Sequence, residues 1–161
     1  MRIAVGCDHA GFALKKEMAA MLAQLGHQVE DVGAFEIEPL DDYPDYAKKV
    51  AVAVASGRCE RGVVVCGSGV GASVAANKVP GVRSALCHDT FSGRQGVEDD
   101  DMNVICLGAR VIGPALAAEV LKAFLAAKFS GAERHVRRLN KVKAIEQDAL
   151  KGVFSSEVTR G

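Results

Sequence analysis

Residues Val63 to Lys78 read VVVCGSGVGASVAANK, with a cysteine at the end of an apolar run and three glycines among the next five residues. A continuous β-branched run is typical of a strand buried on both faces of a parallel sheet. Glycines between such a strand and a helical pattern indicate a tight turn, where outward-facing N–H groups favour an anion. We therefore predict a strand over 61–66 and a short helix over 72–78, with a binding site between them.

Similar units occur along the whole chain of 161 residues. Short apolar runs predict further strands over 2–7, 27–33, 82–87 and 103–108. Helical periods predict helices over 10–26, 45–57, 113–129 and 133–150, with a mixed helix and loop over 89–101. This alternation is typical of an α/β/α sandwich, a Rossmann-like, doubly wound fold with a five-stranded parallel sheet, here followed by a C-terminal helix. We assign 1–150 to one domain and 151–161 to a flexible tail.

The composition indicates a cytoplasmic protein. Lys+Arg and Asp+Glu total 20 each, so no net charge favours nucleic acid or an anionic membrane. The five cysteines form no C-x-x-C pair, which favours a reducing compartment over a disulfide framework or a zinc site. No apolar run approaches the roughly 18 residues that span a bilayer, and the N-terminus becomes polar too soon for a signal peptide.

Candidate site residues follow from the parallel sheet, because such sheets bind ligands beyond the carboxyl ends of their strands. The segments selected are Cys7-Asp8-His9, Cys66-Gly67-Ser68-Gly69, Cys87-His88-Asp89 and Gly108-Ala109-Arg110. Cys66 would lie in the positive potential of a helix N-terminus, which lowers a thiol pKa and promotes the thiolate. Ser68 places a hydroxyl beside it.

Two other interpretations of this loop stay open. Gly67-x-Gly69-x-x-Ala72, with Asp89 about 20 residues further on, matches a relaxed dinucleotide fingerprint and would suit an oxidoreductase. A lone motif of this kind is weak, and the chain is short for two nucleotide-binding halves. Alternatively, Cys66 is a small buried apolar residue and the glycines only turn the chain.

Five segments occur in the order GCDHAGFALK, DDYPDYA, CGSGVGASVAANK, NVICLGAR and ERHVRR. Over about residues 1–147 the chain resembles the ribose-5-phosphate isomerase B family, which includes the galactose-6-phosphate isomerase subunits. The resemblance implies an aldose–ketose isomerase of a phosphosugar that uses no metal and no organic cofactor. It also implies a homodimer or homotetramer with active sites at the subunit interface.

The resemblance also implies individual roles. Cys66 is similar to the family's base, which moves a proton between neighbouring carbons through an enediolate, and Ser68 would help protons move between the two oxygens. Backbone amides of the loop would form the anion hole; the loop residues are Gly67, Gly69, Val70, Gly71 and Ala72. Asp8 and Tyr43 would contact the sugar, and Asn77 would brace the loop. His88 is a further candidate for substrate contact.

Phosphate binding has its own pattern. Arg134 and Arg138 are spaced i, i+4, so one helix face presents both guanidiniums, which suit bidentate phosphate contacts. A solvated basic face is the alternative reading of this spacing. In the family their counterparts gather around the phosphate with those of His9 and Arg110.

The chain departs from the family at Glu98-Asp99-Asp100. The family usually carries histidine at the position of Asp99, where it opens the sugar ring, and Asn or Asp at the position of Asp100. A carboxylate with an ordinary pKa of about 4 is a poorer neutral-pH proton shuttle than an imidazole at about 6.5. Either Asp99 has a raised pKa, or the substrate never forms a ring, or catalysis is weakened. If catalysis were lost altogether, the chain would be a non-catalytic subunit that binds a phosphosugar. The resemblance favours ribose 5-phosphate and ribulose 5-phosphate; the alternative is the acyclic pair erythrulose 4-phosphate and erythrose 4-phosphate.

Overall fold

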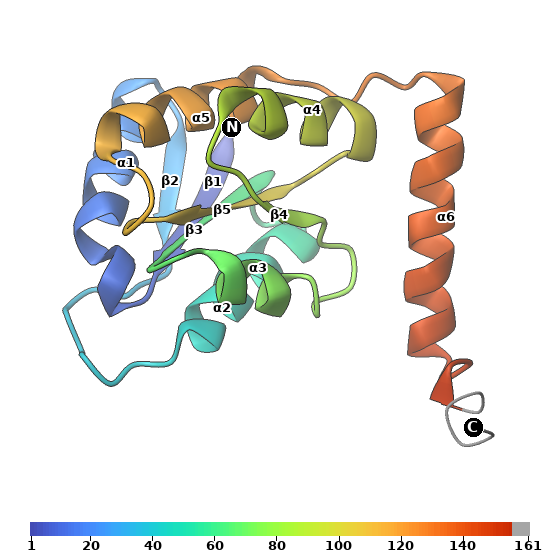
Figure 1. The fold of residues 1–161 in the computed structure, drawn as a ribbon, viewed down its shortest axis with the longest axis horizontal. Helices are drawn as coiled ribbons and strands as arrows, with labels where there is room; N and C mark the ends of the chain where they lie inside the picture. Colours follow the sequence, from blue (N-terminus) through green and yellow to red (C-terminus); the bar gives the residue numbers. More distant parts are fainter. Residues whose placement is uncertain (156–161) are drawn as a thin grey trace.

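A computed structural model describes residues 1–155, which form one five-stranded parallel sheet with helices on both faces (Figure 1). The strand order is β2-β1-β3-β5-β4. The strands are β1 (Arg2–Cys7), β2 (Gln28–Asp31), β3 (Arg61–Cys66), β4 (Ser84–Leu86) and β5 (Val104–Gly108). The predicted doubly wound α/β sheet is confirmed.

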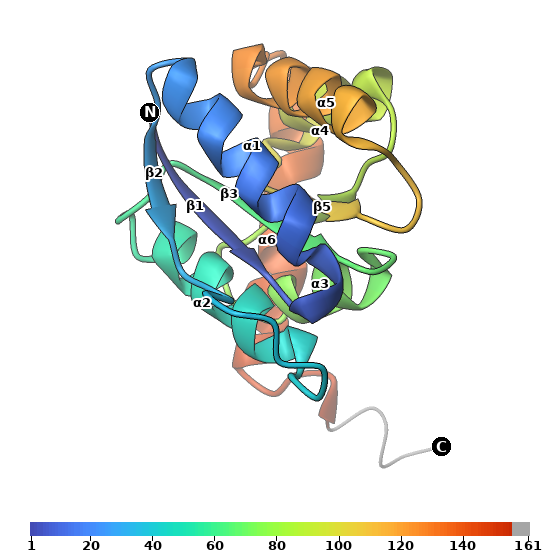
Figure 2. The same cartoon turned by 90° about the vertical axis from the view of Figure 1, so that its left-hand side faces the viewer.

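Helices α1, α4 and α5 cover one face of the sheet, and α2 and α3 cover the other (Figure 2). Their bounds are η1 (His9–Gly11), α1 (Phe12–Gln24), α2 (Tyr43–Ala55), α3 (Val70–Ala76), α4 (Thr90–Asp100), α5 (Pro114–Ala126) and α6 (Glu133–Leu150). The last helix, α6, stands clear of the sandwich (Figure 1). Within residues 1–155 no helix is long and apolar enough to cross a bilayer.

The central strand β3 is continuously apolar because both of its faces are buried. Val63 and Val65 pack into the core beneath α5, where Phe124 is fully buried. Val64 points to the opposite face and packs with Val50 of α2. Because successive strand residues face opposite sides, a strand covered by helices on both sides must be apolar at every position.

Several predicted boundaries were wrong by a few residues. The strand predicted over 82–87 is only Ser84–Leu86, because the chain at Arg83 bonds across to the turn between α4 and β5. Helix α3 begins at Val70 rather than 72, since Gly69 adopts a left-handed conformation with φ 82° and turns directly into the helix. Helix α2 begins at Tyr43, and its proline lies in the first turn, where it is tolerated.

The ends of two other segments also differ from the prediction. The helix predicted from residue 10 opens with the short turn η1 and becomes α-helical at Phe12. Strand β2 covers only Gln28–Asp31 of the predicted 27–33. Of the predicted tail, 151–155 continue in turns beyond α6, and 156–161 lie outside the described residues.

The winding of the sheet reverses between β1 and β3, because β2 lies on one side of β1 and all later strands lie on the other. Cys7 pairs in register with Val65, so the residues that follow each strand leave the sheet side by side. A crevice at such a reversal, at the carboxyl ends of the strands, is where open α/β sheets bind ligands. Asp8 and Cys66 lie at this position.

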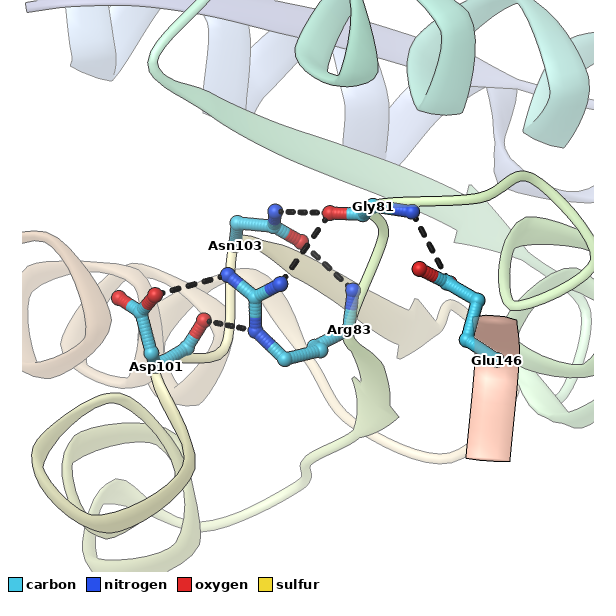
Figure 3. Close-up of polar contacts among 5 residues, drawn as sticks. All are labelled: Gly81, Arg83, Asp101, Asn103 and Glu146. Carbon is cyan, nitrogen blue, oxygen red and sulfur yellow. Dashed lines mark hydrogen bonds and ion pairs between the residues drawn. The ribbon is translucent and has the colours of Figure 1, made fainter. Parts of the chain in front are cut away.

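Helix α6 is anchored at two points. Near its start His135 and Leu139 are buried, and towards its end Glu146 accepts a hydrogen bond from the Gly81 amide at 3.0 Å (Figure 3). Between these points a groove of about 710 Å³ separates α6 from the sandwich. Val142 and Ile145 of α6 line the groove and are 50% and 60% exposed, so within residues 1–155 this apolar face is only partly covered.

Candidate active site

Cys66 and Asp8 form the centre of the site. The Cys66 thiol donates to Oδ2 of Asp8 at 2.9 Å, and Oδ1 of Asp8 accepts from the Gly11 amide at 3.0 Å. Both side chains belong to buried residues, Cys66 being 8% and Asp8 6% exposed. The carboxylate is therefore held by two donors and in turn holds the sulfur at the reversal point of the sheet.

Cys66 does not have the predicted low pKa. Burial raises the pKa of this thiol above its ordinary value, and the hydrogen bond and charge of Asp8 raise it further. The amides of Gly69 and Gly67 lower it, as the loop chemistry suggested, but they are outweighed. The prediction that the positive potential of the loop promotes the thiolate was wrong, because burial and then the neighbouring Asp8 carboxylate favour the protonated sulfur more strongly.

Replacing Asp8 by asparagine should make Cys66 more reactive. Asparagine removes the negative charge but keeps an acceptor, so the pKa of the thiol falls towards its ordinary value. At a pH below the thiol pKa, lowering the pKa by one unit raises the thiolate fraction about tenfold. We expect iodoacetamide to alkylate Cys66 several-fold faster near neutral pH. Peptide mapping of the alkylated protein measures this rate.

Asp45→Asn is the matched control, since it removes an exposed carboxylate in the first turn of α2. The remaining thiols are poor competitors: burial raises the pKa of Cys7, Cys59 and Cys87 to about 11 and that of Cys106 to about 12. Unchanged alkylation of Cys66 in Asp8→Asn would show that Asp8 does not keep the thiol protonated.

The glycine-rich loop joins Cys66 to α3 and presents polar groups outward. Ser68 is exposed, and its hydroxyl accepts from the Val70 amide at 3.3 Å. The N–H groups of a first helical turn have no acceptor within the helix, so the amides up to Ala72 are potential donors to a ligand. Tyr43 lies against this turn, because a Cβ on Gly71 would come within 2.6 Å of its ring.

The loop after β5 interlocks with the glycine-rich loop. The amides of Ala109 and Arg110 donate to the carbonyls of Cys66 and Gly67, both at 2.9 Å. A Cβ on Gly108 would lie 2.5 Å from the Ser68 carbonyl oxygen, so only glycine permits this approach. The exposed Arg110 side chain lies over Gly67, which places a cation beside Cys66.

His9 contacts a residue that the sequence did not indicate. Its Nδ1 lies 2.6 Å from Oδ1 of Asp41, and its backbone amide donates to the same oxygen at 3.2 Å. Asp41 belongs to the quoted DDYPDYA segment, but no local pattern predicts that it reaches back 32 residues to the end of β1.

His88, Asp89 and Asn77 have structural contacts. Nε2 of His88 accepts from the Gly108 amide at 2.9 Å and so braces the end of β5. Asp89 caps α4 by accepting from the Ser92 amide at 2.7 Å. Asn77, expected to brace the glycine-rich loop, instead ties α3 to β4 by exchanging hydrogen bonds with Ser84.

The geometry argues against the dinucleotide interpretation. In that motif the acidic residue follows a strand that lies next to the glycine-rich turn. Here β5 lies between β3 and β4, so Asp89 is separated from the glycine-rich loop by a whole strand. The capping bond of Asp89 explains its presence at the start of α4 without a ribose.

Four predicted site residues lie away from Cys66 in the same chain: Asp99, Asp100, Arg134 and Arg138. Helix α4 starts after the carboxyl end of β4 and runs back, so its last residues lie at the opposite edge of the sheet. Arg134 and Arg138 are exposed on α6, which stands beyond that edge (Figure 1). One chain therefore does not bring these arginines into a cavity shared with Cys66.

The turn after Asp100 is held rigidly. The Arg83 guanidinium donates to the Asp101 backbone carbonyl at 2.7 Å and to its carboxylate at 2.8 Å (Figure 3). Asn103 accepts from the Arg83 amide at 2.8 Å and donates to Gly81 at 2.9 Å. This network fixes the end of α4 relative to α6, because Glu146 of α6 bonds to the same Gly81.

Asp99 is already engaged as a hydrogen-bond acceptor. Nε2 of Gln95 donates to Oδ2 of Asp99 at 3.1 Å, and Oδ1 lies 3.4 Å from Nδ1 of the buried His135, which pairs with it when protonated. Ser130 contacts the same His135 nitrogen at 2.7 Å. The Asp99 carboxylate is therefore held by the Gln95 side chain of its own helix.

Comparison with known proteins places the chain in a family. The family described as Ribose/Galactose Isomerase matches residues 3–142. The chain belongs to this family. It is a sugar-phosphate isomerase, as the ordered motifs suggested. Within residues 1–155 no group of three His, Cys, Asp or Glu side chains is placed to hold a metal ion.

Similar relatives carry two different substrate names. Ribose-5-phosphate isomerase B of Escherichia coli is 44% identical over 146 residues, 91% of this chain and 97% of that protein. The D-erythrulose-4-phosphate isomerase of Pectobacterium atrosepticum is 42% identical over 134 residues, 81% of this chain and 86% of that protein.

Solved structures of the family superpose closely. Ribose-5-phosphate isomerase B of Clostridium thermocellum, 44% identical, has a TM-score of 0.89 and matches 92% of this chain and 99% of its own. The Mycoplasma genitalium enzyme with bound ribulose 5-phosphate, 35% identical, has a TM-score of 0.87 over 91% of this chain and 97% of its own.

Proposed function

We propose that Cys66 is the base of this isomerase and that Asp8 controls its protonation. The supporting observation is the contact of 2.9 Å between the sulfur and Asp8 at the reversal point of the sheet. When a sugar hydroxyl donates to Asp8 in place of the thiol, one cause of the raised thiol pKa is lost; burial and the charge of Asp8 still raise the pKa, and the loop amides still lower it. Substrate binding would thus favour the thiolate.

The thiolate then removes a proton from the carbon beside the carbonyl, and the electron pair moves to the carbonyl oxygen to give an enediolate. The loop amides donate to the developing oxyanion. Ser68 passes the hydroxyl proton between the two oxygens, and the Cys66 thiol returns its proton to the neighbouring carbon. The product is the isomeric phosphosugar, with no net change in protons or electrons.

We infer that a second copy of the chain completes the site. The base and loop lie at one edge of the sheet, and Asp99, Asp100 and the two α6 arginines lie at the other, so each chain carries two different half-sites. The partly uncovered apolar face of α6 supplies a surface on which a copy can pack. The functional unit is then a homodimer, or a tetramer of such dimers, whose sites lie at the subunit interface.

The preferred substrate in this proposal is an acyclic four-carbon phosphosugar. An aldose 5-phosphate closes a furanose ring through its C4 hydroxyl, whereas the C4 oxygen of erythrose 4-phosphate carries the phosphate and cannot close one. Asp99 stands in place of the histidine that opens the sugar ring in the family. An acyclic substrate needs no ring opening, so this replacement should cost little isomerisation rate. The hydrogen bond that Asp99 already accepts from Gln95 supports this choice over a proton-donating role.

Ribose 5-phosphate and ribulose 5-phosphate are the second candidate pair. The relatives with 44% identity that carry this substrate in their names favour it. We propose the cytoplasm as the compartment, because all five cysteines are free thiols, which suits a reducing environment.

A panel of four- and five-carbon substrates tests the preference. Erythrulose 4-phosphate should be isomerised faster than ribulose 5-phosphate, and erythrose 4-phosphate much faster than ribose 5-phosphate. Asp99→His restores an imidazole and should raise kcat/KM for ribose 5-phosphate by about tenfold or more, within the range for general acid catalysis. In the same variant, kcat/KM for erythrose 4-phosphate should stay nearly unchanged. Equal or reversed rates in the wild type would remove the four-carbon assignment.

A further inference from the structure

We propose that Asp41 is a positioning residue that holds His9 with its Nε2 nitrogen directed at the substrate phosphate. The inference rests on the proposed function, and on His9 and Arg110 being the phosphate contacts that the family resemblance implies for the chain that carries Cys66. Asp41 lies in the loop before α2 and reaches the residue that follows Asp8. It begins the DDYPDYA segment, but no local pattern assigns it a role, and its contact with His9 exists only in the folded chain.

The contact is built as a two-point clamp. Oδ1 of Asp41 receives both the backbone amide of His9 and the ring nitrogen Nδ1, at 3.2 and 2.6 Å. The Asp41 side chain is 6% exposed and that of His9 is 32% exposed, so the carboxylate is shielded while the ring reaches the surface. Two bonds from one residue to one oxygen fix the ring orientation as well as the loop.

This clamp selects one form of the imidazole. An ionised carboxylate only accepts hydrogen bonds, so Nδ1 of His9 must carry the proton. In neutral His9 the lone pair is then on Nε2, and in the charged ring Nε2 carries a second N–H. Nε2 is thus the nitrogen left to meet a ligand.

The ring orientation that Asp41 fixes also suits binding of an anionic ligand. A phosphate dianion is bound best by charged donors, and in its charged form the clamped ring presents the Nε2 N–H to such a ligand. With Arg110 over Gly67, the chain would then present two cationic donors near the thiol. Removing Asp41 should weaken binding of the phosphate group, while the chemistry at Cys66 is preserved.

Kinetics and NMR of three variants test the role. Asp41→Ala removes the acceptor, Asp41→Asn keeps an acceptor without charge, and Glu36→Gln is the control, an exposed carboxylate in the same loop. For Asp41→Ala we expect KM for the phosphosugar, and the inhibition constant of inorganic phosphate, to rise about tenfold or more, as for a lost charge-assisted contact. Its kcat should stay within about threefold, because only ground-state binding is lost. Asp41→Asn should show a smaller rise in KM, and Glu36→Gln none.

The ring itself gives a readout that loss of folding would not mimic. Two-bond ¹H–¹⁵N spectra of neutral His9 should show the Nδ1–H tautomer in the wild type and in Asp41→Asn, and a shift towards Nε2–H in Asp41→Ala. An unchanged tautomer in Asp41→Ala, or a fall in kcat at constant KM, would overturn the proposal. If the wild type isomerised no phosphosugar, the proposed function would fail, yet the tautomer and inorganic phosphate measurements would still decide the role of Asp41.

Discussion

Replacing Cys66 by alanine should abolish isomerisation and leave phosphosugar binding nearly intact. The substitution removes the sulfur that takes the proton but keeps Asp8, which retains its bond to the Gly11 amide at 3.0 Å. Loss of a positioned base costs about 10²–10⁴ in rate, so kcat should fall at least about a hundredfold if Cys66 has this role. The sugar hydroxyls and phosphate keep their partners, so the dissociation constant should change less than about threefold, or 0.7 kcal/mol.

A coupled assay gives kcat, and calorimetric titration of the inactive variant with substrate gives the dissociation constant. The matched control is Cys59→Ala, which removes another buried thiol, one that contacts Glu30 rather than Asp8. Cys59→Ala should keep near wild-type turnover. If Cys66→Ala still turned over at a comparable rate, another group would be the base. Loss of both binding and turnover would indicate a collapsed site instead.

Mixing two inactive variants should restore activity. One variant carries Cys66→Ala, and the other carries Arg134→Ala and Arg138→Ala together. In the proposed dimer, each variant alone has two defective sites, but a mixed dimer combines the intact half-site of one chain with that of the other. Random exchange between two C2-symmetric dimers makes about half of them mixed with one good site each, so activity should reach about a quarter of wild type.

The two variants are refolded together and their isomerase activity is measured. Native mass spectrometry counts the mixed dimers in the same sample. The control mixture pairs Cys66→Ala with Arg110→Ala, whose defects lie in the same half-site because Arg110 contacts Gly67. No arrangement of those two chains gives an intact site, so no activity should return. Recovery in the control, or none in the first mixture, would contradict a site shared between copies.

The fold could be predicted almost completely because its signals are local. The β-branched run of 61–66 indicated a strand covered on both faces, and the structure has Val63 and Val64 fully inside on opposite sides. Errors occurred where a long-range bond overrides the local pattern. Strand β4 is shortened because the Arg83 amide is taken by Asn103, a residue 20 positions away.

The site could be predicted in part. Parallel strands with helical crossovers bring all their carboxyl ends to one edge, so the residues after β1, β3 and β5 were expected to meet, and Asp8, Cys66 and Arg110 lie together there. The same reasoning could not show that Asp99 and the α6 arginines lie at the other edge. That placement depends on where α4 ends and how α6 is held, through contacts such as the one between Glu146 and Gly81.

By itself the sequence determined the five-stranded parallel sheet, the glycine-rich turn after Cys66 and the family, since these depend on hydrophobic periodicity, turn residues and ordered motifs along the chain. Only the tertiary structure decided that the thiol pKa is raised, that His9 is clamped by Asp41, and that Asp99 and the α6 arginines lie away from Cys66. Charge interactions, hydrogen bonds and burial depend on distance through space. The thiol and Asp8 are 58 residues apart in the sequence and 2.9 Å apart in the fold.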